Sequence, residues 1–120
     1  VNDRIDAKAL KEQIYRMTVR GDSYVICIES VGVRPGQGIS SSGKFMRAAG
    51  AIEAVSAICS ERVEFVFPQA WKKEMGLGQD KSKSLELART LFPDAMLNLK
   101  KHHGKAEALL IAEYARRTFA

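Results

Sequence analysis

The chain has 120 residues, of which 46% are hydrophobic and 28% are charged, so it is long enough to bury a core and has an ordinary globular composition. No apolar run approaches about 20 residues, which excludes a membrane span, and the polar opening VNDRIDAKALKEQ predicts no signal peptide. The formal net charge of +5 favours a polyanionic partner, most commonly nucleic acid.

The positive charge is concentrated in residues 68–105. This segment holds eight lysine or arginine residues and four aspartate or glutamate residues, a net of +4. A solvated lysine surface is the alternative interpretation of the same segment.

The first half of the chain predicts two helices with a strand between them. DAKALKEQIYRMTVR has the period of an amphipathic helix over about 6–20, capped by Asp6 and ended by Gly21 and Asp22. YVICIE (24–29) is a short β-branched run, typical of a strand covered on both faces. A Gly- and Ser-rich loop then leads to a helix over about 44–60.

The second half predicts one more strand and three helices. VEFVFP (63–68) reads as a strand, and Pro68 starts a short helix that the glycines at 76 and 78 end. Asp80 or Ser82 caps a further helix that closes before Pro93, and the last helix runs over about 105–118. The alternation of strands and helices predicts an α/β fold with a small, mainly parallel sheet flanked by helices, in one domain over 1–120.

The small number of predicted strands is unusual for a complete domain. Two strands make a marginal sheet, so we expect the strand over 24–29 to lack a neighbour that it needs.

The cysteines Cys27 and Cys59 lie in apolar segments without CxxC spacing, which predicts reduced, buried thiols in a cytoplasmic protein.

GISSSGKF (38–45) matches the spacing of a phosphate-binding P-loop and lies between a predicted strand and a predicted helix. Phe45 occupies the position where that motif needs Ser or Thr for Mg²⁺, so nucleotide binding is the weaker alternative. A Gly- and Ser-rich loop ending in Lys44 at a helix N-terminus still suits a phosphate of another kind, including a DNA backbone.

Three residues are candidates for a chemical role. Glu29 ends an otherwise apolar strand, where parallel sheets place their sites. His103 and Glu107 have i, i+4 spacing and share a helix face with Leu110, Ile111 and Tyr114. A carboxylate on so apolar a face needs a partner, which could be a lysine such as Lys101 or Lys105, a backbone N–H or a metal ion.

Three stretches together resemble the phage and RuvC-type Holliday-junction resolvases of the ribonuclease H-like superfamily. They are VICIESVGVRPGQGISSSGKFMRAAGAIEAV, VFPQAWKKEMGLGQDKSKSLELARTLFP and HHGKAEALLIAEYARR. The resemblance spans about residues 6–117 and implies an incomplete ribonuclease H-like fold. The family's N-terminal strands, including the one that carries an essential Asp, have no counterpart in these 120 residues.

The resemblance implies a Mg²⁺- or Mn²⁺-dependent endodeoxyribonuclease acting on four-way or other branched DNA in recombination. It makes Glu29 and Glu107 metal ligands and His103, which replaces a usual Asp, a ligand or proton carrier. The expected phosphate contacts are Lys44, Lys72, Lys73, Lys81, Lys100 and Lys101. With a ligand strand missing, we expect a two-metal site in this chain to hold its ions loosely and the chain by itself to be inactive or weakly active, and a non-catalytic branched-DNA binder is the alternative. We expect a homodimer that covers the open strand edge, and we expect Trp71 to lie in the core.

Overall fold

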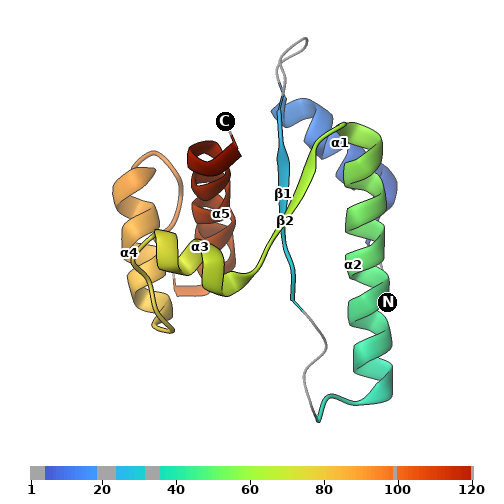
Figure 1. Ribbon diagram of the computed structural model, residues 1–120, viewed down its shortest axis with the longest axis horizontal. Coiled ribbons are helices and arrows are strands. Elements are labelled where there is room, and N and C mark those ends of the chain that lie inside the picture. Colours follow the sequence, from blue (N-terminus) through green and yellow to red (C-terminus); the bar gives the residue numbers. More distant parts are fainter. Residues whose placement is uncertain (1–4, 19–23, 32–35, 99, 120) are drawn as a thin grey trace. The chain divides into compact units, whose positions relative to one another are not determined.

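The computed structural model describes residues 5–18, 24–31, 36–98 and 100–119, with the side chain of Lys100 left out (Figure 1). The chain forms two compact units, Val1–Glu64 and Phe65–Ala120, and each is described by itself below. The elements, in order, are α1 (Ala7–Met17), β1 (Ile26–Glu29), α2 (Ile39–Cys59), β2 (Val63–Val66), α3 (Pro68–Glu74), α4 (Lys81–Leu91), the 3₁₀ turn η1 (Lys100–His102) and α5 (His103–Phe119).

The fold is α/β, as predicted, with β1 and β2 paired in a small two-stranded parallel sheet. The N–H of Ile26 donates to the carbonyl oxygen of Arg62 at 3.1 Å where the two strands begin. Helix α2 provides the crossover that a parallel pair requires. This arrangement is consistent with an incomplete ribonuclease H-like fold. The residues of β1 are half-buried, so the strand is less covered than its apolar run predicts.

Helix α1 begins where its sequence predicts. Asp6 is the N-cap, and its carboxylate accepts a hydrogen bond from the backbone N–H of Ala9 at 3.0 Å, which satisfies one of the donors that a helix start leaves unpaired. Ile14 is the buried residue of this helix, and α1 packs against α2. The predicted helix end at Gly21 and Asp22 lies outside the described residues.

Helix α2 begins five residues earlier than predicted, at Ile39, and this corrects the interpretation of GISSSGKF. The N–H of Ser42 donates to the carbonyl oxygen of Gly38, the N-cap, at 2.9 Å. Residues 39–45 are therefore helical, and their N–H groups are directed along the helix axis instead of around a phosphate. Lys44 lies in the second turn of α2 and not at its N-terminus, so the P-loop interpretation is wrong.

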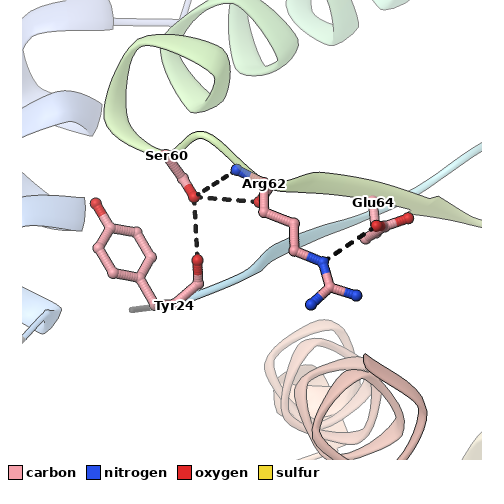
Figure 2. Close-up of polar contacts among 4 residues, drawn as sticks. All are labelled: Tyr24, Ser60, Arg62 and Glu64. Atoms are coloured by element: carbon pink, nitrogen blue, oxygen red, sulfur yellow. Dashed lines mark hydrogen bonds and ion pairs between the residues drawn. The ribbon is translucent and has the colours of Figure 1, made fainter. Parts of the chain in front are cut away.

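A hydrogen-bond network joins the start of β1 to the end of α2 (Figure 2). The Ser60 hydroxyl lies 3.1 Å from the carbonyl oxygens of both Tyr24 and Arg62, and it accepts the Arg62 N–H at 3.1 Å. The Tyr24 hydroxyl donates to the carbonyl oxygen of Cys59. The Arg62 guanidinium binds Glu64 at 3.4 Å. These contacts fix where the two strands start relative to each other.

Both ends of helix α3 are determined by residues of the local sequence. Pro68 occupies the first turn, where its missing N–H costs nothing. At the other end the N–H of Gly76 donates to Lys73 at 3.1 Å and that of Leu77 donates to Lys72 at 2.7 Å, the two bonds of a Schellman motif. Gly76 has φ +71°, a conformation that this motif requires and that residues with a side chain rarely adopt.

The second unit has its core where α5 packs against α3 and α4. Trp71 and Leu110 are completely buried, which confirms the prediction that Trp71 belongs to the core. Asp80 caps α4, accepting from the N–H of Ser82 at 2.9 Å. Within the described residues, no helix is both long and apolar enough to cross a membrane.

Candidate functional site

Helix α5 carries two of the three predicted site residues. It begins at His103, two residues before the predicted start, so His103 and Glu107 are both helical at i, i+4 spacing. This spacing places them on one face of α5, one turn apart. Both are half-buried, while Ala106, Leu110 and Ile111 of the same helix are buried. The structure therefore places both residues on one helix face, as predicted, while a shared ion stays a prediction.

Glu107 has a partner on another helix. Its Oε2 atom lies 3.9 Å from Nζ of Lys72 on α3, and the two side chains are 23% and 29% exposed. The same ammonium lies 5.6 Å from the centre of the Trp71 ring, close enough for a cation–π contact. Of the partners that the sequence allowed for Glu107, the structure shows a lysine. It is Lys72 and not the predicted neighbours Lys101 or Lys105.

Glu29 is the last residue of β1, in the first unit. It is half-buried and lies at the carboxyl end of a strand in a parallel sheet, as predicted. The parallel pairing of β1 with β2 makes this the sheet edge at which α/β proteins place ligands. That Glu29 and Glu107 bind one ion together stays a prediction.

The chemistry of these residues fits a divalent cation in part. Glu29 and Glu107 offer the carboxylate oxygens that Mg²⁺ prefers, and His103 adds an imidazole that suits Mn²⁺. Within the ranges that the structure describes, no group of three or more His, Cys, Asp or Glu side chains could hold a metal ion. The predicted pair on α5 would supply only part of a ligand set, and a bound ion would need further oxygen ligands.

The predicted phosphate contacts fall on four elements. Lys44 is exposed on α2, Lys73 on α3, Lys81 at the first residue of α4 and Lys101 in η1. Lys72 differs from them because it is half-buried against Glu107. The side chain of Lys100 lies outside the described residues. That these lysines contact DNA stays a prediction.

The cysteines take no part in the candidate site. Cys27 and Cys59 are free thiols, as predicted, but both are half-buried and not buried as their apolar segments predicted. Burial raises the pKa of the Cys27 thiol, and the nearby Glu64 carboxylate raises it further. Because the thiolate is the reactive form, a raised pKa makes the Cys27 thiol less reactive than an ordinary cysteine.

Sequence reasoning missed the contact between Lys72 and Glu107. The two residues are 35 positions apart, and their meeting depends on the packing of α3 against α5. One signal was available: Trp71, the large apolar residue of α3, had to point into the core. That orientation leaves its neighbour Lys72 at the edge of the buried face.

One curated relative supports part of the predicted resemblance. A segment of 49 residues is 51% identical to the chloroplastic Holliday junction resolvase MOC1 of Chlamydomonas reinhardtii, over 38% of this chain and 6% of that protein. No protein-family profile matches the chain. The chain thus spans a small part of the relative's length, and it contains a segment similar to a Holliday junction resolvase.

Proposed function

We propose that this chain is part of a metal-dependent endodeoxyribonuclease that cuts branched DNA, of the phage and RuvC type within the ribonuclease H-like superfamily. The observation that carries the proposal is the 51% identity over 49 residues to a protein named as a Holliday junction resolvase. The α/β fold with a parallel strand pair supports it, as does the basic charge of +5. Four-way DNA junctions are the proposed substrate.

In this proposal the carboxylates of Glu29 and Glu107 hold Mg²⁺ or Mn²⁺, and His103 is a further ligand or a proton carrier. The bound ions would activate a water molecule and stabilise the leaving oxygen of the phosphodiester. Glu29 acts from the carboxyl end of β1, and the α5 pair acts from the first turns of its helix. The exposed lysines Lys44, Lys73, Lys81 and Lys101 would bind backbone phosphates, which position DNA without reading its sequence.

A homodimer is part of the same proposal. In the described residues β1 pairs with β2 in a sheet of two strands, and its residues are half-buried. A strand with a free edge tends to pair with another chain. We therefore expect light scattering at micromolar concentrations to give the mass of a dimer, and a monodisperse monomer would contradict this part of the proposal.

The nuclease assignment is tested by cleavage of a synthetic four-way junction during titration with Mg²⁺ or Mn²⁺. We expect cleavage that depends on the metal and that falls at least about 100-fold in Glu29→Gln and in Glu107→Gln, because each variant removes a charged ligand. Glu86→Gln, at an exposed position of α4, is the matched control and should keep its activity. Junction binding without cleavage by the unmodified chain would favour a non-catalytic branched-DNA binder instead.

Phosphate contacts are tested by the salt dependence of junction binding. Removing one lysine that binds a phosphate should lower the slope of log affinity against log salt by about one. We expect this for Lys73→Ala and for Lys81→Ala. Lys8→Ala, at an exposed position of α1, should leave the slope unchanged, and an equal change in all three variants would indicate a general effect of charge.

A further inference from the structure

Lys72 and Glu107 form an ion pair inside the second unit, at a position where the proposed function places a metal ligand. The carboxylate comes from α5 and the ammonium from α3, two helices that pack against each other. Glu107 therefore already has a cation beside it. Any divalent ion that binds this carboxylate meets the positive charge of Lys72 at the same place.

The geometry of the pair allows it to open. The distance of 3.9 Å between Nζ and Oε2 is longer than a charge-assisted hydrogen bond of about 2.7–2.9 Å. Both side chains keep access to water, at 29% and 23% exposure, so the ammonium can move into solvent without unfolding the helix. The Lys72 ammonium lies 5.6 Å from the ring centre of Trp71, which is completely buried.

We propose that Lys72 is a positioning residue that occupies the place of a divalent cation at Glu107, and that metal binding to Glu107 displaces its ammonium. This inference rests on the proposed metal role of Glu107. It separates Lys72 from the exposed lysines that were grouped with it as phosphate contacts: Lys72 regulates how readily the carboxylate accepts metal. The positive charge of Lys72 lowers the affinity of Glu107 for a metal ion. While no metal is bound, the ammonium holds the Glu107 carboxylate in place.

The test is Mn²⁺ binding by the full chain, measured by calorimetry and by electron paramagnetic resonance, without any nuclease assay. We expect Lys72→Met to bind Mn²⁺ about fivefold more tightly, since two unit charges at about 4 Å interact by about 1 kcal/mol in water. Lys73→Met is the matched control, because it removes the same charge from the next residue of α3, which is exposed. Glu107→Gln should abolish the effect of Lys72→Met. Equal tightening by both lysine variants, or none in Lys72→Met, would overturn the proposal.

The outcomes separate this proposal from the function on which it rests. If Glu107→Gln leaves Mn²⁺ binding unchanged, Glu107 is not a ligand, and both the metal role and the inference fail. If Glu107→Gln weakens binding but Lys72→Met does not strengthen it, the metal role stands and the displacement is wrong.

A measurement on the unmodified chain avoids the risk that a variant misfolds. During titration with Mg²⁺, the side-chain ¹³Cε and ¹Hε resonances of lysine report changes around each ammonium. We expect those of Lys72 to shift as the ion binds, while those of Lys73 stay in place. Saturable Mg²⁺ binding that leaves the Lys72 resonances unmoved would also overturn the proposal.

Discussion

The two units bury very different amounts of apolar side chain. Among the described residues, nine of the eleven buried apolar residues belong to the second unit, and the first unit contributes Ile14 and Val55. The reverse holds at the surface, where seven of the eleven exposed large apolar residues lie in the first unit. Because hydrophobic stabilisation scales with the area removed from water, the second unit has a core of its own. The first unit leaves large apolar side chains exposed among the described residues, and this is the surface that the proposed partner would cover.

The largest effect expected from this comparison is at Trp71, in the second unit. Trp71→Ala should lower the free energy of unfolding by about 3–5 kcal/mol, because it leaves a large cavity among buried neighbours. Phe67→Ala is the matched control, an aromatic residue that is 65% exposed just before α3, and it should cost less than about 1 kcal/mol. Urea denaturation followed by far-UV circular dichroism measures both, since Trp71 is the one tryptophan of the chain. Similar losses in the two variants would contradict the assignment of the core.

A smaller loss is expected at the buried residue of α1. Ile14→Ala should cost about 2 kcal/mol, at the low end for such truncations, because the first unit buries few apolar neighbours. Ile5→Ala, at a position that is 36% exposed, should cost less than about 1 kcal/mol. The same urea titration gives both values. A loss for Ile14→Ala as large as that for Trp71→Ala would show that the first unit has a core comparable to that of the second.

The polar network of the first unit offers a third test. Ser60→Ala removes the hydroxyl that contacts Tyr24 and Arg62 (Figure 2), and it should cost about 1–2 kcal/mol, since the backbone groups lose their partner. Ser40→Ala, at an exposed position of α2, should change stability by less than about 0.5 kcal/mol. We also expect faster amide exchange of Ile26 in Ser60→Ala, because its hydrogen bond to Arg62 begins the strand pair. Unchanged exchange would indicate that the network does not hold the strands.

The parts of the fold that the sequence predicted are those set by local rules. Asp6 and Asp80 cap α1 and α4 by bonds to N–H groups two or three residues away, and Gly76 ends α3 because its backbone must adopt positive φ. Each of these depends on a few adjacent residues. The candidate residues Glu29, His103 and Glu107 were found in the same way, from their places at a strand end and on a helix face.

The predictions that failed concern features that local sequence does not determine. The start of α2 was placed at Lys44, because Gly and Ser favour loops, yet the helix extends back to Ile39. The ion pair of Lys72 with Glu107 joins two helices, and no spacing within either helix predicts it. Helix propensity and charge pattern are weak guides where tertiary packing decides.

The smallest effect is expected at an ion cluster on α5, and it tests whether charge contributes less than the core to the stability of the second unit. Hydrogen bonds from Arg116, followed by those from Arg117, lower the pKa of Glu113 from its ordinary 4.5 to about 2. A carboxylate with a lowered pKa stabilises the fold above its ordinary pKa and loses that contribution as pH falls through the folded value. The melting temperature of the unmodified chain should therefore exceed that of Glu113→Gln by a constant amount above about pH 5. The difference should shrink between about pH 4.5 and 2, and it should be reduced by 1 M salt because exposed pairs are screened. A difference that persists unchanged at pH 2 would contradict the assigned cause, and one as large as that for Trp71→Ala would reverse the ranking of core over surface charge.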